Sequence, residues 1–149
     1  MNPLIYERLE KLPHKVDVNR SDWRQVQEEL LDLANWMADY CKEHYIPMVI
    51  TSIIRGKIPG ISTSDTHAEG RAFDVSIKGM TTDDIDDILI TCNRYFAKNF
   101  GAISSSDGIA RAVIYETYGH VGPFKAMEYL RVSTNVVPHL YFQVRRMIH

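Results

Sequence analysis

A histidine and an aspartate in the middle of the chain have the types and the spacing of two ligands of one metal ion. His67 is followed by Gly70, Ala72 and Asp74 within the run THAEGRAFDV. Glycine at position 70 permits a turn whose backbone angles are closed to most other residues. Side chains alternate along a strand, so Ala72 and Asp74 share a face, and the small alanine leaves space beside the carboxylate. An imidazole and a carboxylate placed in this way are two ligands of the kind that Zn²⁺ accepts.

A third ligand is expected near the end of the chain. His139 begins the run HLYFQV directly after Pro138, whose ring restricts the chain that enters this strand. Two histidines and one carboxylate leave the fourth position of a tetrahedral ion to water, which is typical of catalytic rather than structural zinc. The sequence therefore predicts a Zn²⁺ cofactor held by His67, Asp74 and His139.

The apolar periodicity indicates the elements that must position these ligands. Residues 21–45 have helical spacing, and a second helix is expected to begin at Thr81 or Thr82. Residues 1–20 are expected to form an irregular N-terminal arm. Short strands rich in β-branched and aromatic residues are expected at 48–54, 71–77, 110–117 and 139–144. The predicted fold is α+β, with one domain over residues 21–149, two main helices and a small, mostly antiparallel sheet.

Length and charge exclude several classes of protein. The 149 residues are enough for one domain. A hydrophobic content of 45% is typical of a globular chain rather than a disordered one. The 17 lysines and arginines against 19 aspartates and glutamates give a net charge of −2, which indicates neither a nucleic-acid partner nor a membrane surface.

The cysteines and the N-terminus indicate the compartment. Cys41 and Cys92 lack a CxxC spacing, so we expect buried, reduced thiols, with a disulfide as the alternative. The N-terminus has no apolar core of a signal peptide, and no apolar run approaches the ~20 residues of a membrane span. We therefore expect synthesis in the cytoplasm without an export signal.

The same motifs resemble those of a known family. The runs TSIIR, THAEGRAFDV, VIYE and PHLYF, in this order, are similar to the zinc D-alanyl-D-alanine carboxypeptidases and phage endolysin peptidases, which are related in fold to hedgehog. The family pattern is a strand ending in Ser-Gly-Tyr-Arg, then Ser-x-His-x-x-Gly-x-Ala-x-Asp, then a distal histidine. The resemblance covers residues 49–142. It implies a hedgehog-like domain with His67, Asp74 and His139 as zinc ligands.

The resemblance also implies two catalytic residues. Arg55 matches the arginine of the first motif, and its guanidinium suits a substrate carboxylate or the oxyanion formed when water attacks an amide. Many members have an acid three residues before the last histidine, where this chain has Val136. Other members have a glutamate that ends the preceding strand, and Glu116 matches that version. It would take a proton from zinc-bound water and hand it to the leaving amine. The alternative for Arg55 and for Glu116 is a solvent-exposed side chain without a catalytic role.

The expected function is that of a zinc-dependent peptidase, a carboxypeptidase or an endopeptidase, which cleaves a peptide bond in the stem peptides of bacterial peptidoglycan. The enzyme would come from a phage or prophage and reach the cell wall after holin-dependent release or as part of a virion, beside other virion proteins. D-Ala–D-Ala, L-Ala–D-Glu and cross-bridge bonds all stay open as the bond cleaved.

Two non-enzymatic interpretations stay open. In the first, a catalytically inactive member of the same fold serves as a virion structural part or a binding module. Three departures from the family pattern favour it: Asp65 in place of the motif serine, Ile53-Ile54 in place of Gly-Tyr, and Val136. In the second, the zinc is purely structural and has no open position for substrate.

Overall fold

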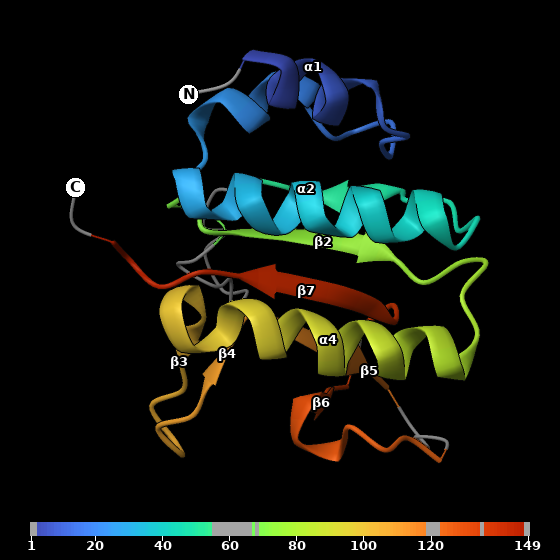
Figure 1. The fold of residues 1–149 in the computed structure, drawn as a ribbon, viewed down its shortest axis with the longest axis vertical. Coiled ribbons are helices and arrows are strands. Elements are labelled where there is room, and N and C mark those ends of the chain that lie inside the picture. Colours follow the sequence, from blue (N-terminus) through green and yellow to red (C-terminus); the bar gives the residue numbers. More distant parts are fainter. Residues whose placement is uncertain (1–2, 55–66, 68, 119–122, 135, 148–149) are drawn as a thin grey trace.

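Helices cover one face of a five-stranded sheet in an α+β fold (Figure 1). The computed structural model describes residues 3–54, 67, 69–118, 123–134 and 136–147. The helical segments are α1 (Pro3–Lys11), the 3₁₀ turn η1 (Arg20–Gln25), α2 (Glu28–Glu43), α4 (Thr82–Phe100) and the 3₁₀ turn η2 (Met127–Tyr129). The strands of the sheet are β1 (Ile50–Ser52), β2 (Ala72–Ser76), β5 (Val113–Thr117), β6 (Leu130–Val132) and β7 (His139–Gln143). A separate hairpin pairs β3 (Ala102–Ile103) with β4 (Ala110–Arg111).

The sheet is mixed: three of its strand pairings are antiparallel, as expected for most of the sheet, and one is parallel, which the sequence did not predict. Its strand order is β1-β2-β7-β5-β6. Strand β2 pairs antiparallel with β1 and β7, and β7 pairs antiparallel with β5, but β5 and β6 run parallel. Parallel neighbours need a crossover of about a dozen residues or more, and residues 118–129 between β5 and β6 have that length.

The face of the sheet that lies against α2 and α4 is apolar and forms the core. Phe73 on β2 and Phe142 on β7 are fully buried, and their stacked ring centroids are 4.7 Å apart. Trp23 of η1 meets the Phe73 ring edge-on at 5.3 Å. The two helices contribute buried aliphatic side chains: Leu30, Leu33, Met37, Ile85, Ile88 and Leu89. Burial of each such side chain stabilises the fold by about 1.5–3 kcal/mol, so this layer fixes the sheet against the helices.

The opposite face of the sheet is largely polar, and the strand register places its side chains next to one another. Asp74 on β2 is the register partner of Tyr141 on β7, and Ser76 is the partner of His139. On the other side of β7, His139 is the partner of Glu116 on β5. Residues directly opposite each other share a face of the sheet. Three neighbouring strands therefore present Asp74, His139 and Glu116 on one face.

Both expected helices are present, and capping explains where they begin. The first begins later than expected, at Glu28, because residues 20–25 form the turn η1. The second, α4, follows Thr81, whose hydroxyl accepts the N–H of Asp84 while the Asp84 carboxylate accepts the N–H of Thr81. This reciprocal capping box satisfies two backbone donors and fixes the start of α4.

The expectation of an irregular arm is wrong for α1. Pro3 occupies the first helical position, where its missing N–H removes no intrahelical bond. Leu9 is fully buried in the core, and Arg8 forms an ion pair of 2.7 Å with Asp39 on α2. Tertiary contacts with α2 therefore stabilise a helix within the segment that was expected to be irregular.

The strand expected over residues 110–117 is divided into β4 and β5. The side-chain Oδ1 of Asn93 on α4 accepts the N–H groups of Ala112 at 2.7 Å and Val113 at 3.2 Å. Because these two N–H groups bond to Asn93 instead of a neighbouring strand, the strand is interrupted at that point. The sequence did not indicate β3 or β6, which are only two and three residues long.

Cys41 and Cys92 are buried free thiols, which confirms the expectation of reduced cysteines. Burial raises the pKa of the Cys41 thiol to about 12, so it stays protonated and unreactive at neutral pH. Among the described residues, no helix is both long enough and apolar enough to cross a membrane.

Candidate metal centre

His67 is held with one ring nitrogen directed at Asp74. The imidazole is fully buried, and its Nδ1 lies 2.7 Å from the carbonyl oxygen of Ile53. A carbonyl oxygen can only accept, so Nδ1 carries the proton and Nε2 keeps a free lone pair in the neutral ring. That Nε2 lies 3.4 Å from Oδ1 of Asp74. Histidines that bind a metal through one ring nitrogen typically donate the N–H of the other to a carbonyl or carboxylate, as Nδ1 of His67 does to Ile53.

His139 is held in the same way from the other side of Asp74. Its Nδ1 lies 2.7 Å from the carbonyl oxygen of Val137, which again leaves Nε2 as the nitrogen with the lone pair. This Nε2 lies 3.7 Å from the same Asp74 Oδ1. The three predicted ligands are therefore brought together, with the two histidines approaching a single carboxylate oxygen.

The spacing and the burial of these atoms fit a zinc ion. Two ligands of a tetrahedral Zn²⁺ at 2.0–2.2 Å are about 3.3–3.6 Å apart, close to the two histidine–Asp74 distances. Nε2 of His67 and Oδ1 of Asp74 are buried and have no hydrogen-bond partner. An unsatisfied buried polar atom costs about 1–3 kcal/mol, a cost that a bound cation would remove.

As the side chains stand, no group of three or more His, Cys, Asp or Glu residues in the described part of the chain is arranged to hold a metal ion. The case for a metal here therefore rests on the two histidine–carboxylate approaches and on the unpaired buried atoms.

A pocket of about 1000 Å³ opens beside these residues, and we call it the metal-side pocket. Asp74, His139 and Glu116 all line it. The other residues that line it are Lys15, Asp17, Thr51, Ser52, Ser76, Arg131, Ser133, Thr134, Val136, Val137, Pro138 and Tyr141. A space of this size accommodates a small ligand or several residues of a peptide. Two of the three candidate ligands, Asp74 and His139, therefore face this pocket, whereas the fully buried His67 does not line it.

Glu116 lies next to the candidate ligands, where a general base is expected. It is the register partner of His139 on the adjacent strand, and its side chain is largely buried, with 16% exposed. Arg131 on β6 donates from Nη1 to Oε2 of Glu116 at 3.2 Å. The carboxylate is therefore fixed at the wall of the metal-side pocket rather than turned away to solvent.

Sequence reasoning missed Arg131. Its guanidinium lies 5.9 Å from the centre of the Tyr141 ring, in addition to its ion pair with Glu116. No motif marks this arginine, because the short strand that carries it was not predicted. The arginine singled out from the sequence, Arg55, lies outside the described residues, as does Asp65. Val136 is apolar and lines the metal-side pocket three residues before His139.

Ser52 and Tyr141 are two further residues that the sequence did not single out. Ser52 on β1 is the register partner of Asp74, and its buried Oγ has no hydrogen-bond partner. Tyr141 meets the His67 ring edge-on, with centroids 5.4 Å apart. These residues enclose the candidate ligands from the neighbouring strands, which only the strand register could have indicated.

The turn between His67 and β2 is fixed by glycine and by an ion-pair network. Gly70 has a φ of +71°, and a Cβ at this position would lie 2.8 Å from the carbonyl oxygen of Gln25. Glu69 accepts hydrogen bonds from Arg146 and Arg71, which lower the pKa of its carboxyl to about 2. The segment that carries the first candidate ligand is therefore attached to the end of the chain.

Comparisons with models of protein families, with curated protein sequences and with solved structures find no match to this chain. The geometry of the site is therefore the basis on which a function is proposed.

Proposed function

We propose that the protein is a zinc-dependent peptidase whose metal ligands are His67, Asp74 and His139. The observation that carries the proposal is the approach of two histidine Nε2 atoms to one buried, unpaired oxygen of Asp74. Both rings have their Nδ1–H bonded to backbone carbonyls, so both offer a lone pair toward the same point. This donor set has the composition of catalytic zinc sites that leave one position open.

The chemistry divides between the ion and the chain. A zinc ion in such a site lowers the pKa of a water molecule toward ~7 and polarises a carbonyl group. Glu116 accepts the proton from the attacking water and delivers it to the leaving amine, for which its place opposite His139 is suitable. Arg131 holds the Glu116 carboxylate and offers further N–H donors to the negative charge that develops on the substrate.

The substrate class comes from the resemblance of the motifs to cell-wall peptidases. We propose a hedgehog-like domain that cleaves a stem peptide of bacterial peptidoglycan and comes from a phage or prophage. The metal-side pocket, of about 1000 Å³, has a volume that accommodates a short peptide as well as a small molecule. Arg55 remains a proposed partner for a substrate carboxylate, and holin-dependent release or a virion remains the proposed route to the wall.

The proposal is tested by measuring metal content and hydrolysis in the same preparations. We expect about one zinc per chain and release of new amino or carboxyl groups from purified peptidoglycan. Glu116→Gln should keep the zinc and lose about 100-fold or more of the activity, which is the usual contribution of a general base. Glu43→Gln, an exposed glutamate at the end of α2, is the matched control and should change neither.

Two results would overturn the proposal. Protein that binds no zinc, even when refolded with the metal, would contradict the ligand assignment. Protein that holds stoichiometric zinc but hydrolyses no peptidoglycan would contradict the peptidase and favour a binding module or a structural part of a virion.

A further inference from the structure

The polar face of the sheet carries a second pocket, of about 660 Å³, beyond the metal-side pocket. Ile114 and Gln143 line it from β5 and β7, and Arg131 lines both pockets. Five arginines line the second pocket against two carboxylates: Arg71, Arg111, Arg131, Arg145 and Arg146 against Asp107 and Glu128. We call it the arginine pocket. Two carboxylates outside this lining pair with three of the arginines: Glu69 with Arg71 and Arg146, and Glu116 with Arg131.

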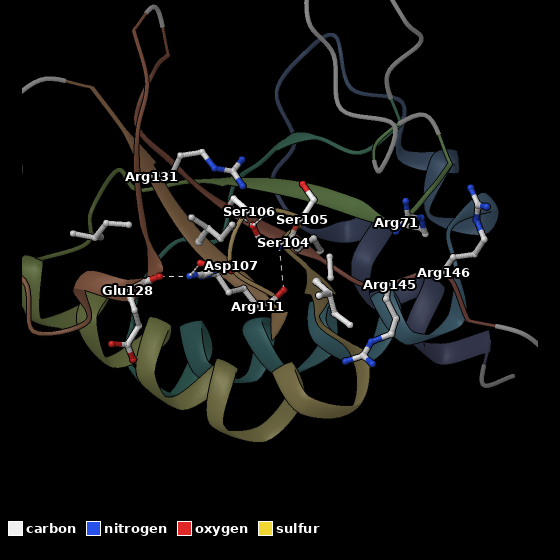
Figure 2. Close-up of a pocket in the computed structure, with 15 residues that line it drawn as sticks. Arg71, Ser104, Ser105, Ser106, Asp107, Arg111, Glu128, Arg131, Arg145 and Arg146 are labelled. Atoms are coloured by element: carbon white, nitrogen blue, oxygen red, sulfur yellow. Dashed lines mark hydrogen bonds and ion pairs between the residues drawn. The ribbon is translucent and has the colours of Figure 1, made fainter. Parts of the chain in front are cut away.

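Two of the five arginines serve the fold. Arg111 forms an ion pair with Asp107 and donates to the backbone oxygen of Glu128. Arg145 donates to the backbone oxygens of Lys98 and two further residues at the end of α4, and Figure 2 shows its guanidinium turned toward that helix. Although both side chains line the pocket, these contacts engage Arg111 with the β3–β4 hairpin and Arg145 with the end of α4.

The other three arginines lie around the space of the pocket. In Figure 2 the guanidinium of Arg131 lies on one side, those of Arg71 and Arg146 lie on the other, and Ser105 lies between them. Arg71 is fixed through Nε to Glu69 and through Nη1 to the backbone oxygen of Val144. A guanidinium has five N–H donors, so an arginine held in this way still offers donors in a fixed geometry.

The separation of the two pockets matches an extended peptide. His139 begins β7 and Gln143 ends it, so the candidate metal ligand and the Gln143 end of the arginine pocket are about 13 Å apart along the strand. A peptide that lies along the polar face in an extended conformation covers this distance in about four residues. Arg131 lies between the two pockets and lines both.

We propose that the arginine pocket is a subsite for a carboxylate-bearing residue of the peptide substrate, about four residues from the bond that is cleaved. This inference rests on the proposed peptidase, because it takes the metal-side pocket as the place of cleavage. When an acidic side chain binds there, its carboxylate loses hydrogen bonds to water and gains hydrogen bonds from arginine N–H groups that the fold already holds in place. Hydrogen bonds to charged groups of this kind are worth about 1.5–3 kcal/mol, or about tenfold to a hundredfold in affinity.

The test compares the binding of matched peptides to the full-length, zinc-treated protein. The probes are fluorescent alanine-based octapeptides that carry a single glutamate at successive positions, each with its glutamine counterpart. We expect the glutamate peptide to bind about tenfold more tightly than the glutamine peptide at one position, with the preference lost when the glutamate moves by two or more residues. Arg146→Gln, which leaves the metal-side pocket intact, should remove most of this preference.

Arg94→Gln, which removes the same charge from an exposed position of α4, is the control and should leave the preference unchanged. Equal binding of the two peptides at every position, or binding of neither, would overturn the subsite even if the protein hydrolyses peptidoglycan. A preference that does not depend on position, or that Arg94→Gln removes equally, would show general charge attraction and would overturn it too. A position-dependent preference in a protein without zinc or hydrolysis would leave the anion site standing while the proposed peptidase fails.

Discussion

Glu116 and His139 are direct register partners on adjacent antiparallel strands, and their side chains lie on the same face of the sheet. Residues in such a pair have Cβ atoms about 4.5–5.5 Å apart. The proposed proton carrier is therefore fixed next to a proposed metal ligand by the backbone ladder itself. Arg131 on β6, the strand on the other side of β5, also holds the Glu116 carboxylate through an ion pair.

The unpaired atoms of the site predict a stability change on metal binding. Zinc at about 100 times its dissociation constant should stabilise the native state by about 2.7 kcal/mol, because the unfolded chain lacks the assembled site. For a chain of this length that raises Tm by about 5–10 °C, measured by calorimetry with and without a chelator. Asp74→Asn should abolish the shift. Asp32→Asn, at an exposed position of α2, should retain it, and an equal shift in the two variants would contradict the assignment.

Gly70→Ala should destabilise the protein much more than Gly108→Ala. Both glycines have a positive φ, +71° and +73°, so alanine costs about 1 kcal/mol or more at either position. At Gly70 the added methyl group would also lie 2.8 Å from the backbone oxygen of Gln25, whereas at Gly108 nothing lies within 4 Å. Urea unfolding of the two variants isolates the steric contribution, which we expect to be about 1–3 kcal/mol. Equal losses would show that the close approach to Gln25 is not maintained in solution.

Ser52→Ala should stabilise the metal-free protein or leave its stability unchanged. The buried Oγ has no partner, so removing it relieves a desolvation cost of about 1–3 kcal/mol against a small loss of packing. Denaturant unfolding of chelator-treated protein measures the difference. A loss of more than about 1 kcal/mol would mean that this hydroxyl has a partner in the native protein.

His14 should make the protein less stable as the pH falls below about 6.5. Burial lowers the pKa of its imidazole, helped by nearby Arg20 and opposed by the hydrogen bond to Leu12 and by Glu10. Its Nε2 accepts the indole N–H of Trp23 at 2.9 Å, a bond that only the neutral ring can accept.

The sign of this effect follows from proton binding. The unfolded state takes up the proton at the ordinary histidine pKa of 6.5, while the folded state resists it until a lower pH. Stability from this group is therefore complete above pH 6.5 and is lost as the pH falls toward the lowered folded pKa. The measurement is the unfolding free energy of wild type and of His14→Gln between pH 7.5 and pH 5, about the range in which a histidine titrates. The difference between the two proteins at each pH is the contribution of His14 to stability. A difference that does not vary with pH would contradict the prediction.

Local patterns sufficed for the helices α2 and α4 and for the central motif. The helical spacing of α2 and α4 and the run from His67 to Asp74 are encoded within short segments, so neighbouring residues carry the whole signal. Sequence reasoning failed at α1 and at β6. The first is stabilised by its packing on α2, and the second by a crossover that pairs it with β5. Neither contact is visible in a window of adjacent residues.

The sequence alone indicated the candidate ligands: His67 and Asp74 on either side of a turn that requires glycine, and His139 near the end of the chain. The tertiary structure alone decided what surrounds them. Burial of the apolar face against α2 and α4 fixes the strand register, because a shift of one residue would turn every side chain of a strand to the wrong face. That register places Glu116 opposite His139 and sets the arginine pocket at the far end of β7.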